Sequence, residues 1–432
     1  MSISRRHFLS IATASAAGTL ILNGCSSNRS SSSSNASPAA VSAADAPETT
    51  TAKLGFIALT DAAPLIVAKE QGFFEKYGMT DVEVLKQASW GTTRDNLVLG
   101  SGGGGIDGAH ILSPLPYLIT EGLVTDGKKV PMYILARLNV NGQAISVANA
   151  HKDAGLQLDS AKLMSKVQAA KSAGQQMKFA VTFPGGTHDL WMRYWLAAGG
   201  INPDSDVSTI VVPPPQMVAN MKTGTMDAFC VGEPWNAQLI NQGIGYSALT
   251  TGQLWENHPE KAFAMRADWV DQNPKAALAL LKAVQEAQMW CEENKEEMVS
   301  IVSKRSWFGV PAGDIQDRLN GKFDFGDGRV EENSPHLMKF WADNASYPYK
   351  SHDLWFVTED QRWGYIPTST DAKALVDRVN REDLWKEAAK AIGQEAAIPA
   401  SSSRGVETFF DGVKFDPENP AAYLSSLKIK KA

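Results

Sequence analysis

Short apolar runs and helical segments alternate along this chain from residue 53 onward, and this alternation limits the possible folds more than any other feature of the sequence. Residues 53–59 and 82–85 have the composition and pattern of strands. Between them, residues 62–77 have a helical pattern, with Pro64 in the first turn and Gly78 as the stop. Strands that alternate with helices indicate an α/β fold, and we expect a mostly parallel sheet.

The same alternation restarts after a long extended run at residues 132–147, which we expect to cross into a second lobe. The segment 232–235 is the expected return crossing. The predicted parts are residues 52–140 (first part of lobe 1), 141–235 (lobe 2) and 236–432 (second part of lobe 1 and a C-terminal extension, with helices Pro274–Glu293 and Ala372–Val379). Two α/β lobes joined by two crossings form a hinged clamp, and small ligands usually bind between such lobes.

The first 51 residues have the features of an export and anchoring segment. The twin arginines Arg5 and Arg6 precede an apolar stretch at residues 8–22, which is too short to span a membrane, and Gly24 precedes Cys25. We interpret residues 1–24 as a twin-arginine signal peptide of lipoprotein type and Cys25 as the lipidated first residue; a chance cysteine is the alternative. Residues 25–51 are rich in serine and alanine and are expected to be a flexible linker. The predicted location is the periplasmic side of the inner membrane, reached through a lipid anchor.

Composition and motifs argue against several classes of function. Removal of residues 1–24 takes the formal charge from −6 to −8, and no run of lysine or arginine suggests a nucleic-acid partner. No nucleophile elbow, Walker loop or zinc-protease motif is present, so we expect no enzyme activity, no cofactor and no metal. Cys230 and Cys291 lie among apolar residues, which favours buried free thiols over a single disulfide.

Two helix beginnings have the features of an anion site. Gly185 and Gly186 precede a helix for which Thr187 is the expected N-cap, so His188 would lie in the first turn beside unpaired backbone N–H groups. Trp90 precedes a second helix, for which Thr92 or Thr93 is the expected cap and Gly100 the end. An indole N–H can only donate a hydrogen bond. A capping role for His188 and a packing role for Trp90 remain alternatives.

Several longer segments resemble a known family of periplasmic solute-binding proteins for nitrate, sulfonates and related ligands. The opening helix APLIVAKEQGFF (residues 63–74) is similar to that family as a whole. The segments that resemble its nitrate-binding branch, and the bicarbonate-binding sibling of that branch, are KQASWGTTRDN (86–96), TFPGGTHD (182–189), SYPYKSHD (346–353) and RGVETFFDG (404–412). The similarity extends over residues 51–432.

The resemblance implies a fold, a ligand site and partners. The fold is a two-lobe clamp of the type II-like class of periplasmic solute-binding proteins, with the ligand cleft between the lobes. The partners are nitrate or nitrite and the permease and ATPase subunits of an ATP-driven importer. The family's ligand positions correspond here to Trp90, Gln143, His188, Gly232 and Lys261.

The chemistry of these positions favours nitrate over bicarbonate. Nitrate is planar, singly charged and only accepts hydrogen bonds, and the implied site offers donors. Bicarbonate also carries an O–H group, and the resemblance implies an acidic residue in the bicarbonate-binding sibling where this chain has Lys261. A buried lysine needs a partner, and we expect the bound anion to be that partner. Nitrite is an expected co-ligand. Bicarbonate import is the main alternative, and a hydrolase on the same fold is a second one.

Overall fold

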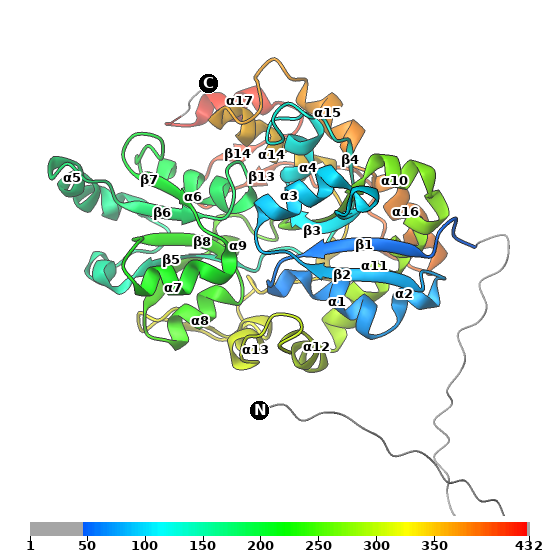
Figure 1. Ribbon diagram of the computed structural model, residues 1–432. Helices are drawn as coiled ribbons and strands as arrows, with labels where there is room; N and C mark the ends of the chain where they lie inside the picture. Colours follow the sequence, from blue (N-terminus) through cyan, green and yellow to red (C-terminus); the bar gives the residue numbers. More distant parts are fainter. Residues whose placement is uncertain (1–45, 430–432) are drawn as a thin grey trace, which may run out of the picture. The chain divides into compact units, whose positions relative to one another are not determined.

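The computed structural model describes residues 46–429, which form two mixed β-sheets with helices packed around them (Figure 1). The strand order is β2-β1-β3-β10-β4 in the first sheet and β7-β6-β8-β5-β9 in the second. The strands of the first sheet are β1 (Thr51–Phe56), β2 (Asp81–Lys86), β3 (Gly108–Leu112), β4 (Met132–Arg137) and β10 (Lys261–Arg266). Those of the second are β5 (Gln143–Ala148), β6 (Lys178–Val181), β7 (Ser208–Val211), β8 (Ala228–Gly232) and β9 (Gly245–Thr250). The α/β class is confirmed.

The expectation of a mostly parallel sheet holds for strand direction, since four of the five strands in each sheet run the same way and one is inserted antiparallel to its neighbours. In the first sheet β1 lies parallel to β2 and β3, whereas β10 lies antiparallel to β3 and β4. In the second, β6 lies parallel to β7 and β8, whereas β5 lies antiparallel to β8 and β9. The antiparallel strands β5 and β10 each enter their sheet directly after a strand or short helix of the other sheet. They therefore lack the long helical crossover that a parallel neighbour requires.

The chain crosses between the sheets twice. The extended run at 132–147 contains β4 of the first sheet and β5 of the second, so the first crossing is where the sequence predicts it. The return expected at residues 232–235 is too early, because β9 still pairs with β5. Residues 232–235 instead turn into helix α8, and the chain returns between Thr250 and Lys261. The division into lobes stays a proposal, and we place the end of lobe 2 at Thr250.

Helices complete the described part of the chain, together with two small hairpins. The helices of the first half are α1 (Ala63–Glu70), α2 (Phe73–Lys76), α3 (Trp90–Leu99), α4 (Leu115–Thr120), α5 (Met164–Ser172), α6 (Thr187–Ala198) and α7 (Met217–Lys222). Those of the second half are α8 (Trp235–Asn241), α9 (Thr251–Leu254), α10 (Ala267–Gln272), α11 (Pro274–Glu293), α12 (Lys295–Val302), α13 (Gly313–Leu319), α14 (Lys350–Trp363), α15 (Ala372–Val379), α16 (Glu382–Ala391) and α17 (Pro420–Ser426). The hairpins pair β11 (Phe323–Asp324) with β12 (Val330–Glu331) and β13 (Glu407–Thr408) with β14 (Lys414–Phe415).

Helices α11 and α15 have the bounds that the sequence predicts. The single helix expected at residues 62–77 is divided into α1 and α2, because Gly72 adopts a left-handed φ of 74°. Within residues 46–429, no helix combines the length and apolar character needed to cross a bilayer.

The predictions for the N-terminal segment fall mostly outside the described residues. The signal peptide (1–24), Cys25 and linker residues up to 45 all belong to that part of the chain. The last linker residues are ordered in the fold: Glu48 accepts hydrogen bonds from the backbone N–H groups of Lys275 (3.2 Å) and Ala276 (3.0 Å), at the start of α11. The folded body therefore begins a few residues before the predicted end of the linker.

The C-terminal segment packs against helix α6. Trp355 of α14 stacks on Trp191 of α6, with ring centroids 4.9 Å apart and planes 17° from parallel. Beyond α14, the hydroxyl of Tyr365 donates to Asp189 Oδ2 of α6 at 2.6 Å. The same Oδ2 atom accepts the backbone N–H of Gly185 at 2.9 Å. The C-terminal segment thus supports the glycine turn from which α6 begins.

Gln288 of α11 fixes the first crossing segment. Its buried Nε2 atom donates to the carbonyl oxygens of Arg137 (2.8 Å), Leu138 (3.0 Å) and Phe340 (2.9 Å). Its Oε1 atom accepts from the hydroxyl of Ser346 at 2.7 Å. A buried carbonyl without a donor is costly, so this side chain holds the end of β4 and residues near 340–346 together.

We expect Gln288→Ala to lower the free energy of unfolding by about 2–4 kcal/mol, because it leaves buried carbonyl groups without a donor. Urea denaturation followed by tryptophan fluorescence measures the change. The control is Gln272→Ala on the exposed end of α10, which should change stability by less than about 0.5 kcal/mol. Equal effects of the two substitutions would contradict this role of Gln288.

Candidate functional site

The five residues that the resemblance implies as ligands all lie at the ends of helices or strands. Trp90 is the first residue of α3 and His188 the second of α6, while Gln143 begins β5, Gly232 ends β8 and Lys261 begins β10. Gln143 lies directly opposite Gly232 in the antiparallel pair β5–β8. The four side chains are at most 1% exposed. Their role as ligands stays a prediction, but their placement is that of a single buried site.

Three of these side chains have buried N–H groups with no hydrogen-bond partner among the described residues. The atoms are Nε1 of Trp90, Nε2 of Gln143 and Nε2 of His188. A buried donor without an acceptor costs about 1–3 kcal/mol, so such atoms are usually paired. A small ligand that only accepts hydrogen bonds would satisfy all three.

The ring of His188 is neutral, and one of its two nitrogen atoms has a hydrogen-bond partner among the described residues. Its Nδ1 atom lies 2.5 Å from the hydroxyl oxygen of Thr182. Burial, and then the positive charge of Lys261, lower the pKa of His188 well below its usual value, so the ring is neutral. The proposed role of His188 as a donor requires the tautomer in which Thr182 donates to Nδ1 and the ring proton lies on Nε2.

The helix caps differ from the sequence prediction at both anion-site helices. The N-cap of α6 is Gly186, not Thr187, whose hydroxyl instead donates to Glu260 Oε1 at 3.0 Å. The N-cap of α3 is Ser89, not Thr92 or Thr93; its Oγ accepts the backbone N–H of Thr92 at 3.1 Å. At α6 the contact of the Thr187 hydroxyl with Glu260 takes that side chain away from a capping role. His188 and Trp90 still lie in the first turns of their helices.

Lys261 has two carboxylate partners within the protein, whereas from the sequence we expected its partner to be the bound anion. Its Nζ atom lies 3.0 Å from Asp61 Oδ2 and also contacts Glu260 Oε1. Asp61 Oδ1 lies 2.6 Å from Nε2 of His110. All four of these side chains are fully buried. The site therefore contains acceptors as well as donors.

The charges in this cluster stabilise one another. Burial lowers the pKa of Lys261, but Asp61 and Glu260 outweigh that effect and raise it. Burial raises the pKa of Asp61, but Lys261 and His110 outweigh that effect and lower it. Burial dominates at Glu260, whose pKa rises to about 7. Lys261 and Asp61 are thus a charged pair, and Glu260 is the carboxyl that can change its charge near neutral pH.

The charged cluster connects the predicted ligands. Lys261 Nζ lies 5.8 Å from the centre of the Trp90 ring, and the rings of Trp90 and His110 are 5.3 Å apart. His188 Nε2 lies 3.8 Å from Glu260 Oε1, too far for a hydrogen bond. A Cβ atom on Gly232 would lie 3.3 Å from Asp61 Oδ2. Sequence reasoning missed Asp61, His110 and Glu260; the position of Glu260 beside Lys261 was the one local signal.

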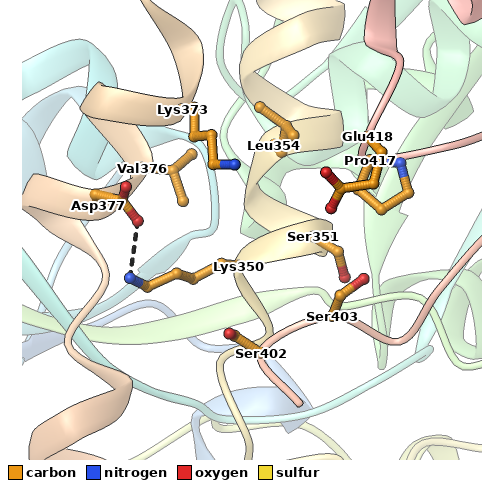
Figure 2. A pocket seen from close by; sticks show the side chains of 10 residues that line it. All are labelled: Lys350, Ser351, Leu354, Lys373, Val376, Asp377, Ser402, Ser403, Pro417 and Glu418. Atoms are coloured by element: carbon orange, nitrogen blue, oxygen red, sulfur yellow. Dashed lines mark hydrogen bonds and ion pairs between the residues drawn. The ribbon is translucent and has the colours of Figure 1, made fainter.

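A separate surface hollow has a different character. It lies beside the start of α14, and its lining includes Lys350, Ser351, Lys373, Asp377 and Ser402 (Figure 2). Lys350 pairs there with Asp377 at 2.8 Å, but 31% and 51% of their side chains are exposed. None of the predicted ligands lines this hollow. It offers a solvated ion pair, in contrast to the buried cluster around Lys261.

Comparison with known proteins finds relatives that align with nearly the whole chain. Residues 45–303 match the profile of the NMT1-like family. The nitrate/nitrite binding protein NrtA of Nostoc sp. is 66% identical over 441 residues, which cover 99% of this chain and 99% of that protein. The bicarbonate-binding protein CmpA of Synechococcus elongatus is 47% identical over 446 residues, covering 100% of this chain and 99% of that protein. The crystal structure of the periplasmic nitrate-binding protein NrtA from Synechocystis PCC 6803 matches with a TM-score of 0.87 and 68% identity, covering 89% of this chain and 100% of that one.

We expect Lys261→Met to destabilise the protein by about 3–5 kcal/mol, because Asp61 loses its buried counter-ion. Thermal denaturation at neutral pH measures the loss. Lys350→Met, which breaks the exposed pair with Asp377, is the matched control and should cost less than about 1 kcal/mol. A Lys261→Met protein as stable as the control would show that the buried cluster is not ionised.

Proposed function

This chain belongs to the NMT1-like family, and from this membership and its close relatives we propose that it binds nitrate outside the cytoplasm for uptake by the cell. Nitrite, which is also a small singly charged acceptor, is the second ligand. The observation that carries this function is the 66% identity to a nitrate/nitrite binding protein over 99% of both chains. The unpartnered N–H groups of the buried site are the chemistry that nitrate requires.

The proposed ligands surround the anion with donors. Nε1 of Trp90, Nε2 of Gln143 and Nε2 of His188 each have an N–H group that no described residue accepts. The ammonium of Lys261 and the backbone N–H of Gly232 complete the set. At Gly232 a Cβ atom would lie 3.2 Å from Leu59 Cδ2 and 3.3 Å from Asp61 Oδ2, which supports close approach of the backbone and of the ligand. Positioned donors in a water-excluded site bind an oxyanion strongly.

Bicarbonate is the alternative to nitrate and nitrite as the ligand. Asp61 and Glu260 are carboxyl groups that could accept the O–H of bicarbonate, and a bicarbonate-binding protein is 47% identical to this chain. Both carboxyl groups, however, are engaged by Lys261. This pairing and the higher identity to nitrate-binding relatives favour nitrate.

The chain acts as the binding component of an importer and has no catalytic role in this proposal. We propose that Cys25, which lies outside the described residues, carries a lipid anchor that holds the protein on the periplasmic side of the inner membrane. A membrane permease receives the anion from the protein, and an ATPase drives its passage. The hydrogen-bond donors of the site hold the anion and do not react with it.

Calorimetric titration of the purified protein with nitrate, nitrite and bicarbonate in parallel tests the function. We expect saturable binding of nitrate and nitrite and much weaker binding of bicarbonate, since it brings an O–H group to carboxyls already paired with Lys261. Tight binding of bicarbonate together with no response to nitrate would reject the assignment.

Trp90→Phe should weaken nitrate binding by about 1–3 kcal/mol, or roughly 5- to 150-fold in Kd, because it removes one N–H donor and keeps a similar ring. Titration calorimetry measures the loss. Trp191→Phe is the matched control: its Nε1 is also buried without a partner, but Trp191 packs in the aromatic cluster with Trp355. An unchanged Kd in Trp90→Phe would remove Trp90 from the site.

A further inference from the structure

The charge of the buried cluster is unfavourable for an anion unless a proton is added. Asp61 and Glu260 are both fully buried beside a single lysine, Lys261. With both carboxyls ionised and the nearby histidines neutral, these groups carry one net negative charge. A nitrate ion would add a second negative charge inside a region of low dielectric, where like charges repel strongly.

Glu260 is the carboxyl group that can accept this proton on an oxygen atom without a hydrogen-bond partner. Both oxygens of Asp61 are engaged, Oδ1 with His110 at 2.6 Å and Oδ2 with Lys261 at 3.0 Å. Glu260 Oε1 accepts from Thr187 at 3.0 Å and contacts Lys261. Its Oε2 atom is buried and has no partner among the described residues. A proton on Oε2 therefore breaks no existing hydrogen bond.

Glu260 also lies next to the proposed anion. Its Oε1 atom is 3.8 Å from Nε2 of His188, which is one of the donors assigned to nitrate. The ion pair with Lys261 joins it to a second proposed ligand. Charge on Glu260 therefore acts on the anion over a few ångströms, through buried surroundings.

We propose that Glu260 takes up one proton when nitrate binds, so that the protein captures the anion and a proton together. This inference rests on the nitrate-binding function proposed above. With Glu260 protonated, Asp61 and Lys261 form a neutral pair and the anion brings the only net charge. The new O–H group of Glu260 can donate a hydrogen bond, which an ionised carboxylate cannot.

The other groups around Glu260 keep their charge near neutral pH. Burial lowers the pKa of His188 and of His110, so both rings stay neutral. Burial raises the pKa of the Cys230 thiol well above its usual value, and the carboxylates raise that of Lys261 against the effect of burial. Among the described residues, the titratable groups that interact with Glu260 are Lys261, Asp61, His188 and Cys230, and His110 interacts in turn with Asp61. Nitrate is the anion of a strong acid and binds no proton itself.

The sign of the pH dependence follows from the pKa of Glu260, which burial raises to about 7. Below that pH the free protein already carries the proton, and affinity is constant. Above it, binding must draw the proton from solution, so affinity falls with rising pH by up to about tenfold per pH unit. The bound anion raises the pKa of Glu260 further, which extends this range upward.

Calorimetric titration of nitrate into the full protein, in buffers of different ionisation enthalpy, measures the proton uptake. We expect little uptake at pH 6 and close to one proton at pH 8. In Glu260→Gln the uptake should vanish and the affinity should become independent of pH. The matched control is Asp360→Asn: Asp360 is a buried carboxyl with both oxygens unpartnered, and burial raises its pKa, but it does not contact the cluster. This variant should keep the wild-type uptake.

Two results would overturn the inference: nitrate binding by the wild type at pH 8 without proton uptake, or uptake that persists in Glu260→Gln. Infrared difference spectra of the wild-type protein provide a second measurement if Glu260→Gln does not fold. A protonated-carboxyl band that appears on adding nitrate at pH 8 supports the inference, and its absence contradicts it. Absence of nitrate binding at every pH is a different result, which rejects the proposed function and this inference with it.

Discussion

The ion pair between Lys261 and Asp61 joins parts of the chain that are 200 residues apart, and the site depends on it. Asp61 follows the first strand of the first sheet, and Lys261 begins the last strand to enter that sheet. Because both side chains are fully buried, each charge stabilises the other, and removal of either would leave an uncompensated charge in the interior. Glu260, Thr187 and His110 are then positioned by contacts to this pair or to each other.

The arrangement separates two tasks that a donors-only pocket would combine. The paired charges of Lys261 and Asp61 stay ionised in the buried site, and their positions are fixed by the surrounding structure. The proposed neutral donors, Nε1 of Trp90, Nε2 of Gln143 and Nε2 of His188, have no partner among the described residues and would supply directional hydrogen bonds to the proposed anion. A flat anion is recognised by hydrogen bonds that point at its oxygen atoms as well as by charge. Buried neutral N–H groups provide such directional hydrogen bonds and add no net charge.

Local patterns predicted the elements of the fold better than the contacts between them. Helix α11 has its predicted bounds, because the apolar period and the proline at its first position, Pro274, are local features of that segment. The return crossing was misplaced, because only the pairing of β9 with β5 reveals which sheet β9 joins. The positions of Trp90 and His188 followed from motifs at helix starts. Asp61 was missed, because no local pattern connects it to a lysine 200 residues away.

Asp189 connects the segment after α14 to the glycine turn that precedes α6. Its Oδ2 atom holds both the N–H of Gly185 and the hydroxyl of Tyr365, and Gly185 lies three residues before His188. The segment that follows α14 is therefore part of the support of the turn from which α6 begins. A chain cut before Tyr365 would keep the bond from Gly185 to Asp189 but would lose the hydroxyl that holds the same carboxylate oxygen from the other side.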